Sequence, residues 1–320
     1  MARIVCTSRI FAEHVARLED AGHEVWVHSG ENPIPRDLLM KRLADAEAVI
    51  SMLTDRIDRE VLSAAPRLQI VANVAVGYEN IDVVAAHEHE IIVTNTPDVL
   101  TEATADLTFA LVLGAARRIA EADATVRRGE FPTWGLEQEL IGADVYGKTL
   151  GIVGMGRIGT AVARRGRRGF AMRILYHNRT RNDVAEREFD AEFVTFDRLL
   201  SESDFVCIHV PLTDETHHVF DHAAFARMKR TAILVNVSRG PVVDEPALVA
   251  SLERGEIAGA GLDVFEHEPE VHPGLLTVRE RVVLAPHLGS ATHEARAGMS
   301  ELAIDNVLAV LAGNPPRTPV

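Results

Sequence analysis

The sequence has very few cysteines and lysines and no long apolar run, and each shortage excludes a class of protein. Its two cysteines, Cys6 and Cys207, lie far apart in apolar segments. This excludes a disulfide framework and a CxxC metal motif, and predicts buried thiols. No stretch contains the roughly 18 consecutive apolar residues that indicate a membrane-spanning helix. The first residues lead directly into a strand-like segment without the apolar region of a signal peptide, which predicts a cytoplasmic protein.

Positive charge is also scarce and is carried almost entirely by arginine. The formal net charge is −14, and the lysines are Lys41, Lys148 and Lys229. A nucleic-acid-binding protein needs a basic face to neutralise phosphates, so this charge argues against nucleic acid as a partner. A small anionic substrate is compatible with it, because a few buried arginines can dominate one pocket.

Short strand-like segments alternate with helical ones along the chain, which indicates parallel sheets with crossover helices. At roughly 100–200 residues per domain, a chain of 320 residues is expected to form two domains. The expected strands of the first series are 3–6, 24–27, 48–52, 69–72 and 91–94. Those of the second series are 149–153, 173–176, 205–210, 232–237, 258–263 and 282–285. A long helix over 101–128 and a loop at 129–135 connect the two series, and a last helix over 292–311 is expected to return to the first domain.

The second series opens with a glycine-rich turn between a strand and a helix, Gly154-Met155-Gly156-Arg157-Ile158-Gly159. The first glycine permits a tight turn, the second lets the backbone approach a pyrophosphate, and the third lets helix and strand pack closely. Free N–H groups at the start of the helix suit the phosphates. The flanking strand and helix supply the context that the short motif alone lacks, so we predict a dinucleotide site. A glycine-rich turn without a ligand is the alternative.

The next strand ends in the segment Tyr176-His177-Asn178-Arg179-Thr180. An NAD-binding unit places an acidic residue about 20 residues past the glycines to hold the ribose 2′-hydroxyl, and this segment has none. A guanidinium can pair with a 2′-phosphate that an acidic side chain would repel. We therefore predict that Asn178, Arg179 and Thr180 favour NADPH over NADH. In the alternative interpretation Arg179 stacks on the adenine or points to solvent, and NAD is used.

Three further segments follow consecutive expected strands, at the edge where open α/β sheets bind ligands. They are Val235-Asn236-Val237-Ser238-Arg239-Gly240, Gly261-Leu262-Asp263-Val264-Phe265-Glu266-His267-Glu268-Pro269 and Ala285-Pro286-His287-Leu288-Gly289-Ser290-Ala291-Thr292. With the glycine-rich turn they resemble the D-isomer-specific 2-hydroxyacid dehydrogenase family over essentially the whole chain. The resemblance includes Val76-Gly77-Tyr78-Glu79-Asn80-Ile81-Asp82 and Thr94-Asn95-Thr96-Pro97. It is strongest to the glyoxylate/hydroxypyruvate reductase branch and the related 2-ketogluconate reductases.

The resemblance implies an α/β fold with two parallel-sheet domains. A Rossmann-type NAD(P)-binding domain is expected at 99–289, and a discontinuous, flavodoxin-like substrate-binding domain at 1–98 with 290–320. The implied activity is reduction of a small 2-keto acid, glyoxylate or hydroxypyruvate, to the D-2-hydroxy acid. Reduction of 2-ketogluconate, pyruvate or phenylpyruvate is an alternative. A dinucleotide-binding regulator is another, but no added DNA-binding segment or interaction tail is present.

Three residues carry the chemistry that the resemblance implies. Arg239, with its rigid fork of donors, is expected to contact the substrate carboxylate and keto oxygen. His287 is the expected general acid in reduction and the base in the reverse direction. Glu268, the acidic residue just before a proline, is expected to fix the tautomer of His287 and to favour its protonated form. Glu266 competes with Glu268 by position, and we expect it to be solvated.

Other contacts are also implied by the resemblance. The backbone N–H groups of Val76 and Gly77 are expected to bind the substrate carboxylate, since neutral donors and a glycine permit close approach. The remaining substrate contacts are expected from Leu53, Ser290 and Trp134. Asp263 is expected to accept from the nicotinamide carboxamide. The other cofactor contacts are expected from Val210, Pro211, Val237 and Gly289.

The arm that holds Trp134 predicts a homodimer. In related glyoxylate reductases such a residue reaches into the active site of the partner subunit, and packing in the dimer or core is the alternative. Either interpretation places the dimer on the helix and arm at 101–135. No metal is expected, because the His-rich run at 87–90 lacks a further ligand motif. The pair His217-His218 is expected to be solvated.

Overall fold

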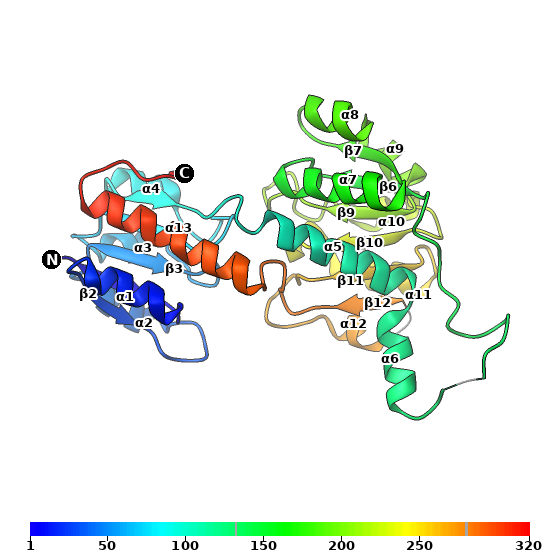
Figure 1. Cartoon of the computed structure of the whole chain (residues 1–320), viewed down its shortest axis with the longest axis horizontal. Helices are drawn as coiled ribbons and strands as arrows, with labels where there is room; N and C mark the ends of the chain where they lie inside the picture. Colours follow the sequence, from blue (N-terminus) through cyan, green and yellow to red (C-terminus); the bar gives the residue numbers. More distant parts are fainter. Residues whose placement is uncertain (132, 279–280) are drawn as a thin grey trace. The chain divides into compact units, whose positions relative to one another are not determined.

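The computed structural model describes residues 1–131, 133–278 and 281–320, which form two compact units. The first unit comprises Met1–Leu100 with Thr292–Val320, and the second comprises Thr101–Ala291. Each contains one sheet of parallel strands flanked by helices (Figure 1), which confirms the predicted α/β class. Within the described ranges, no helix has the length and apolar character needed to cross a lipid bilayer.

The sheet of the first unit has the strand order β2-β1-β3-β4-β5, which is the flavodoxin-like order. Its central strands are fully buried and almost wholly apolar, as expected where helices cover both faces. The strands are β1 (Arg3–Cys6), β2 (Glu24–Val27), β3 (Ala48–Ser51), β4 (Ile70–Asn73) and β5 (Ile92–Thr94). The helices are α1 (Ala12–Asp20), α2 (Arg36–Leu43), α3 (Arg59–Ser63), α4 (Val83–Glu88) and α13 (His293–Leu311). Helix α13 packs on β3, β4 and α1, so the last segment belongs to the first unit.

The sheet of the second unit has the order β12-β11-β10-β9-β6-β7-β8, which is the Rossmann order extended by one strand. Its strands are β6 (Thr149–Val153), β7 (Arg173–His177), β8 (Glu192–Phe193), β9 (Phe205–Ile208), β10 (Ile233–Asn236), β11 (Gly259–Leu262) and β12 (Val282–Leu284). Its helices are α5 (Thr101–Ala116), α6 (Ile119–Arg127), α7 (Arg157–Phe170), α8 (Asp183–Phe189), α9 (Phe196–Glu202), α10 (His222–Arg227), α11 (Glu245–Glu253) and α12 (Pro273–Thr277). Two helices, α5 and α7, pack together over the sheet.

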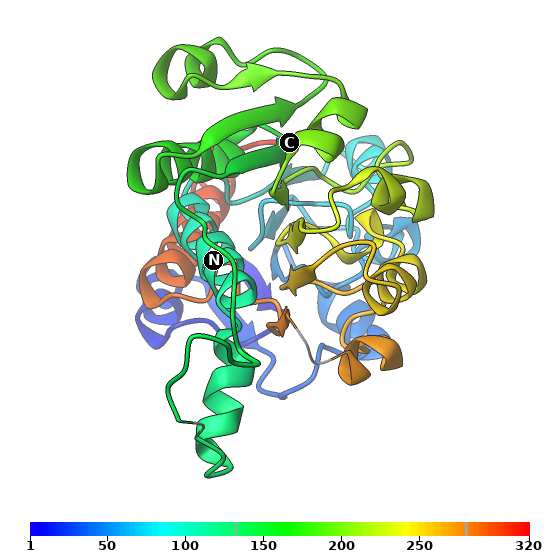
Figure 2. The same ribbon diagram turned by 90° about the vertical axis from the view of Figure 1, so that its right-hand side faces the viewer.

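The long helix expected over 101–128 is wrong, because the chain breaks it into α5 and α6. Arg118 lies between them with φ of 53°, in the left-handed region that interrupts a helix. Its guanidinium pairs with Glu121 at 2.6 Å, and both side chains are largely buried. Helix α5 buries many residues against β10, β11 and β12. Helix α6 buries none, and Figure 2 shows it extending away from the sheet of this unit.

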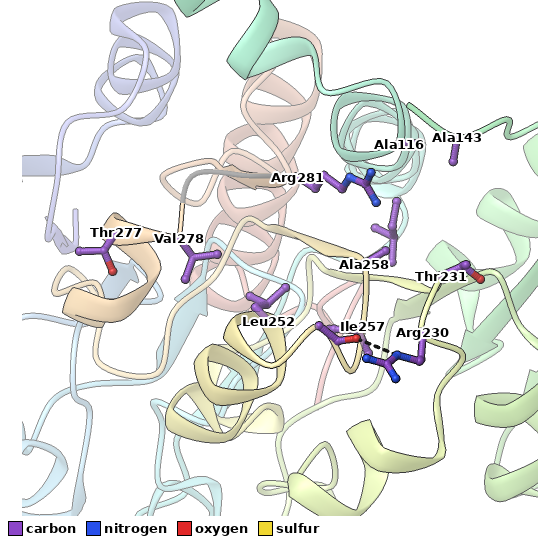
Figure 3. A pocket seen from close by; sticks show the side chains of 12 residues that line it. Ala116, Ala143, Arg230, Thr231, Leu252, Ile257, Ala258, Thr277, Val278 and Arg281 are labelled. Carbon is purple, nitrogen blue, oxygen red and sulfur yellow. Dashed lines mark hydrogen bonds between the residues drawn. The ribbon is translucent and has the colours of Figure 1, made fainter. Parts of the chain in front are cut away.

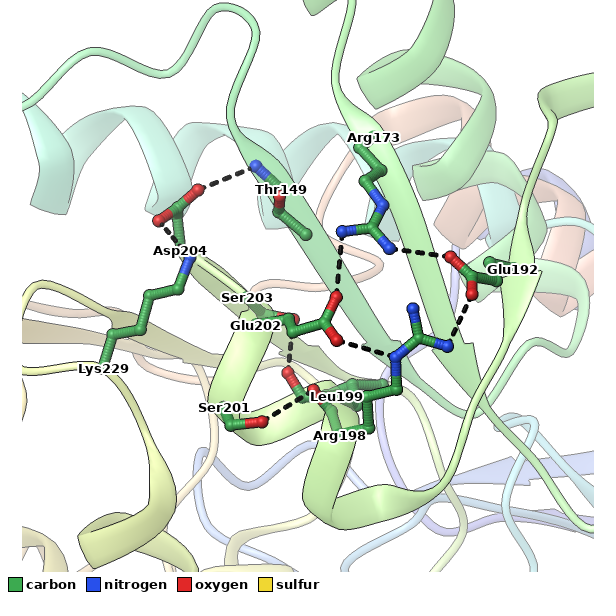
Figure 4. A network of polar contacts seen from close by, with 10 residues as sticks. All are labelled: Thr149, Arg173, Glu192, Arg198, Leu199, Ser201, Glu202, Ser203, Asp204 and Lys229. Atoms are coloured by element: carbon green, nitrogen blue, oxygen red, sulfur yellow. Dashed lines mark hydrogen bonds and ion pairs between the residues drawn. The ribbon is translucent and has the colours of Figure 1, made fainter.

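Four charged side chains form a closed ring at one edge of the second sheet (Figure 4). Arg173 and Arg198 each contact both Glu192 and Glu202, at nitrogen–oxygen distances of 2.6–2.9 Å. Hydrogen bonds from the two arginines hold the pKa of each glutamate below its ordinary value. The four side chains are 35–47% exposed, so solvent screens the pairs and each contributes little to stability. The ring ties β8 to β7 and α9, which explains how a two-residue strand that sequence reasoning missed is held.

Candidate active site

Arg239, Glu268 and His287 follow three neighbouring parallel strands of the second unit. They come after β10, β11 and β12, which are adjacent and parallel in the sheet. The carboxyl ends of these strands meet at one edge, where α/β sheets bind ligands. The structure therefore brings together the three residues predicted to be catalytic.

Glu268 and His287 form a hydrogen-bonded pair. The Nδ1 atom of His287 lies 2.8 Å from Oε2 of Glu268, and the two side chains are about a third exposed. The second carboxylate oxygen accepts the N–H of Phe265 at 3.0 Å, which fixes the plane of the carboxylate. Burial raises the pKa of Glu268, but the hydrogen bond and charge of His287 outweigh it, with help from Arg239, and the net pKa is lowered. The carboxylate is thus charged and accepts a hydrogen bond from Nδ1. The other ring nitrogen, Nε2, lies on the side of the ring away from Glu268.

Asp263 holds the turn on which His287 lies. The N–H of His287 donates to the Asp263 carbonyl at 2.8 Å. The N–H groups of Leu288 and Gly289 donate to its two carboxylate oxygens at 2.6 and 2.8 Å. Burial raises the pKa of Asp263, and these N–H groups and His287 counteract it. His287 itself has φ of 55°, a strained backbone that this fully buried carboxylate supports. Each carboxylate oxygen has a second lone pair that can accept a further hydrogen bond, such as one from the nicotinamide carboxamide. That contact remains a prediction.

Asn236 is the residue that orients Arg239, and sequence reasoning gave it no role. It ends β10 and is 1% exposed. Its Nδ2 donates to the Arg239 carbonyl at 2.9 Å, while its Oδ1 accepts the N–H and hydroxyl of Ser238. The Arg239 guanidinium donates to the Ser238 carbonyl at 2.8 Å. Asn236 could have been identified from the sequence because it is a polar residue at the end of an otherwise apolar strand.

Gly240 sets the distance between the loops that carry Arg239 and Glu268. A Cβ atom at this position would lie 1.8 Å from the Phe265 carbonyl oxygen and 2.5 Å from the Glu266 nitrogen. Both are backbone atoms, so a side chain here would have to separate the two loops. The glycine is needed for this close approach rather than for its backbone angles.

The prediction that Glu266 is solvated is wrong, and the same prediction for the pair His217-His218 is confirmed only for His217, which is exposed. The Glu266 side chain is 14% exposed, and its Oε1 lies 2.7 Å from Nε2 of His218. The N–H of Glu266 donates at 2.8 Å to Glu245, which is 5% exposed and whose pKa is raised by burial. The N–H of His218 in turn donates to the carbonyl of Pro241. Segments far apart in sequence thus form one polar cluster next to the loops that carry Arg239 and Glu268. No local sequence pattern predicts this cluster.

The glycine-rich turn fits the diphosphate of a dinucleotide. A Cβ on Gly154, which has φ of 99°, would lie 2.6 Å from the His209 backbone, and one on Gly159 would lie 2.2 Å from the Gly154 carbonyl. Gly156 has open space around its Cβ position and is the N-cap of α7, where it provides no side-chain cap. The first N–H groups of α7 are therefore available to an anion. The other predicted residues of the turn differ in burial, with Met155 buried, Ile158 half-buried and Arg157 exposed.

The segment after β7 contains two arginines, Arg179 and Arg181, whose surroundings differ. Arg181 pairs with Glu186 at 2.7 Å, and Glu186 also accepts the Tyr176 hydroxyl. Arg179 is exposed, and its charge helps a hydrogen bond from Thr213 to lower the pKa of Glu215. This places Arg179 beside the loop after β9. The remaining residues predicted to touch the cofactor are half-buried Asn178 and Val210, exposed Thr180 and Pro211, and buried Val237.

His209 is a further residue of this region that sequence reasoning missed. It follows β9, and its N–H donates to the Val153 carbonyl beside the glycine-rich turn. Both ring nitrogens are buried, and within the described residues neither has a hydrogen-bond partner. Burial lowers the pKa of His209 to about 3, so its ring is neutral. Its place after an apolar strand resembles that of Asn236, but no motif singled it out.

The remaining predicted substrate residues lie on loops. Leu53 follows β3 and is 37% exposed, and the half-buried pair Val76 and Gly77 follows β4. These three belong to the first unit. In the second unit, Ser290 is half-buried directly after the turn held by Asp263, and Trp134 is 78% exposed on the arm after α6.

A cavity of about 600 Å³ lies at the opposite edge of the second sheet (Figure 3). Thr231, Ile257 and Ala258 line it, and they precede β10 and β11 rather than follow them. Arg230 and Arg281 also contribute, and Arg230 donates to the Gly255 carbonyl. Because the ligand edge of a parallel sheet is at the carboxyl ends of its strands, this cavity is not the candidate active site.

Comparisons with known proteins agree with these features. Residues 109–289 match the family described as D-isomer specific 2-hydroxyacid dehydrogenase, NAD binding domain. A glyoxylate reductase from Thermococcus onnurineus is 51% identical over 317 residues, which cover 98% of this chain and 94% of that protein.

Solved structures give the same result. A glyoxylate reductase from Paecilomyes thermophila superimposes with a TM-score of 0.88 at 34% identity, covering 100% of this chain and 98% of that one. An NADPH-dependent glyoxylate/hydroxypyruvate reductase from Sinorhizobium meliloti, in complex with NADP and malonate, superimposes with a TM-score of 0.84 at 34% identity. It covers 100% of this chain and 96% of that one. The chain is therefore a dehydrogenase with an NAD(P)-binding domain, and it belongs to the D-isomer specific 2-hydroxyacid dehydrogenase family.

Proposed function

We propose that this dehydrogenase reduces a small 2-keto acid, with glyoxylate or hydroxypyruvate preferred, to the D-2-hydroxy acid. The observation that carries the proposal is the Glu268–His287 pair on the strand edge that also carries Arg239. The names of the similar glyoxylate reductases support the choice of substrate. A bound nicotinamide cofactor supplies the hydride that is added to the keto carbon.

The side chains then have distinct roles. Arg239 binds the substrate carboxylate and the keto oxygen, and stabilises the negative charge that develops on that oxygen. His287 donates the proton of its Nε2 to the same oxygen, which completes the hydroxyl group. Glu268 stays charged and orients the ring through Nδ1. After turnover His287 regains a proton from solvent.

The other predicted residues hold substrate and cofactor. The N–H groups of Val76 and Gly77 bind the carboxylate, and Leu53, Ser290 and Trp134 surround the substrate. The first unit is thus the substrate-binding domain, the second binds NAD(P), and Arg239, Ser290 and Trp134 of the second unit also contact the substrate. We assign the cofactor to Gly154, Met155, Gly156, Arg157, Ile158, Gly159, Asn178, Arg179, Thr180, Val210, Pro211, Val237, Asp263 and Gly289.

The cofactor is proposed to be NADPH in preference to NADH. The exposed Arg179 and the lack of an acidic residue at 178–180 support this, because a 2′-phosphate needs a cation and tolerates no nearby carboxylate. Arg179→Ala should lower kcat/KM for NADPH about tenfold and leave NADH unaffected. Arg187→Ala, an exposed arginine of α8, is the control. Equal kcat/KM for NADPH and NADH in the wild type would contradict the proposal.

A homodimer is proposed through the helix and arm at 101–135. Ile119, Val126 and Trp134 are 54–78% exposed, although they are large and apolar. Such clustered apolar exposure is typical of an interface. Val126→Glu should yield a monomer in size-exclusion chromatography with light scattering. Val184→Glu, on the exposed face of α8, should leave the mass unchanged, and a monomeric wild type would contradict the proposal.

Steady-state kinetics test the activity. Glyoxylate, hydroxypyruvate, 2-ketogluconate, pyruvate and phenylpyruvate are compared, each with NADPH and with NADH. We expect the first two to give the highest kcat/KM, and chiral analysis of the hydroxypyruvate product to give the D isomer. A protein that binds NADPH without reducing any of the five would instead be a dinucleotide-binding regulator.

A further inference from the structure

The loop after β4 has three successive carbonyl groups that each accept a hydrogen bond from elsewhere in the first unit. The Ala75 carbonyl accepts the N–H of Thr96 at 2.8 Å. The Val76 carbonyl accepts Nδ2 of Asn95 at 2.8 Å, and the Gly77 carbonyl accepts Nδ2 of Asn73 at 2.9 Å. Two of the three donors are therefore asparagine side chains, and sequence reasoning assigned neither of them a role.

Holding these carbonyls fixes the N–H groups of the next residues. In a trans peptide the C=O and N–H bonds point in opposite directions within one plane, and these peptides are trans. The N–H groups of Val76, Gly77 and Tyr78 therefore point away from the donors on Thr96, Asn95 and Asn73, respectively. Within the part of the chain that the structure describes, none of the three donates a hydrogen bond. Successive free N–H groups in a bend of the backbone can bind an anion.

Both asparagines are themselves held in place. Asn73 is fully buried at the end of β4, and its Oδ1 accepts the hydroxyl of Ser51 at 3.2 Å. A carbonyl oxygen can only accept, so the group of Asn73 that faces Gly77 is Nδ2. Asn95 follows β5, and both its N–H and its carbonyl bond to Thr318 of the C-terminal segment. Asn73 is thus held through its side chain by the end of β3, and Asn95 through its backbone by the C-terminal segment.

We propose that Asn73 and Asn95 are positioning residues for the substrate carboxylate, and that the N–H of Tyr78 is a third donor beside those of Val76 and Gly77. This rests on the proposed function, which assigns the carboxylate to this loop. A loop held in its binding shape does not lose conformational entropy when the substrate arrives, so the asparagines improve affinity without touching the substrate. Their removal should raise KM more than it lowers kcat.

The first test replaces Asn95 by leucine, which has a similar shape and no donor. Asn95→Leu should raise KM for glyoxylate about tenfold or more, change kcat by less than threefold, and weaken malonate binding to the NADPH complex by a similar factor. NADPH affinity, read from its fluorescence, should stay the same. Asn314→Leu, at an exposed asparagine after α13, is the matched control. An unchanged KM and malonate affinity in a folded Asn95→Leu protein would overturn the positioning role.

The second test uses the wild-type protein, so its outcome does not depend on whether a variant folds. The chain has three tyrosines, Tyr78, Tyr146 and Tyr176, so ¹⁵N-tyrosine labelling gives three backbone amide signals. With NADPH saturating throughout, malonate should shift the Tyr78 signal and leave the other two in place. A stationary Tyr78 signal in a protein that binds malonate would overturn the third donor. A wild type that neither reduces a 2-keto acid nor binds malonate would overturn the proposed function, and this inference with it.

Discussion

Replacing Gly240 by alanine tests whether the close approach of two loops sets the geometry of the site. The added Cβ would lie 1.8 Å from the Phe265 carbonyl oxygen, whereas ordinary contact begins at 3.4 Å. The neighbouring atoms are backbone, so no side-chain rotation can relieve the overlap. The loops would have to separate by about 1.6 Å, the difference between these two distances.

This separation has a size that kinetics can detect. It would move Arg239, which precedes the glycine, away from Glu268, which lies three residues after Phe265. A misplacement of about 1 Å can lower the rate about 10²-fold, so we expect kcat/KM for the 2-keto acid to fall by at least this factor. Overpacking costs about 1–3 kcal/mol, which for a domain of this size corresponds to roughly 2–12 °C in Tm.

The assay is steady-state kinetics combined with thermal unfolding followed by circular dichroism. Gly169→Ala in α7 is the control, because nothing lies within 4 Å of its Cβ position. It should leave turnover unchanged and raise stability by up to about 1 kcal/mol. If Gly240→Ala lowers Tm but leaves kcat and KM within twofold, the contact is structural and does not align Arg239 with Glu268. If neither quantity changes, the close approach itself is refuted.

Three other predictions follow from charge and burial. Glu268→Gln replaces a carboxylate, which can only accept from Nδ1 of His287, by an amide that can also donate to it and so hold the wrong tautomer. The kcat for reduction should therefore fall at least about tenfold, and an unchanged kcat would rule out the orienting role. Burial lowers the pKa of His209 to about 3, whereas an unfolded histidine has a pKa of about 6.5. Between these two values only the unfolded chain binds the proton, so the free energy of unfolding decreases as the pH is lowered through this range. Urea unfolding of His209→Gln at pH 7 and 5 should show a smaller loss than the wild type, and an equal loss would contradict this. Burial raises the pKa of Cys6 to about 12 and that of Cys207 as well, so a thiol reagent should modify neither in the native protein and both in urea.

Much of the second sheet could be predicted from the sequence because its signals are local. The strands before Arg239, Glu268 and His287 are short apolar runs, and crossover helices between them imply parallel neighbours. Their carboxyl ends must then share one edge, which is why three residues spread over 49 positions could be brought together without coordinates. The glycine-rich turn was predictable for the same reason, since its strand and helix flank it directly.

The polar support behind these residues could not be predicted, because its partners are distant in sequence. His218 contacts Glu266 across 48 positions, and both lie in segments whose local composition is typical of a solvated loop. The break at Arg118 was missed for a related reason. Helical periodicity continues through it, and the interruption depends on a guanidinium that pairs with Glu121 and also reaches the Glu139 carbonyl.

Three buried strands end in a polar residue. Ser51, Asn73 and Asn236 each end a buried strand, and each is itself fully or almost fully buried. A buried polar side chain must find hydrogen-bond partners, and at a strand end the nearest unpaired groups belong to the loop that follows. Asn73 accordingly binds the Gly77 carbonyl, and Asn236 binds the loop of Arg239. In these two cases, the polar residue that ends an apolar strand holds the backbone of a loop to which the proposed function assigns substrate binding or catalysis.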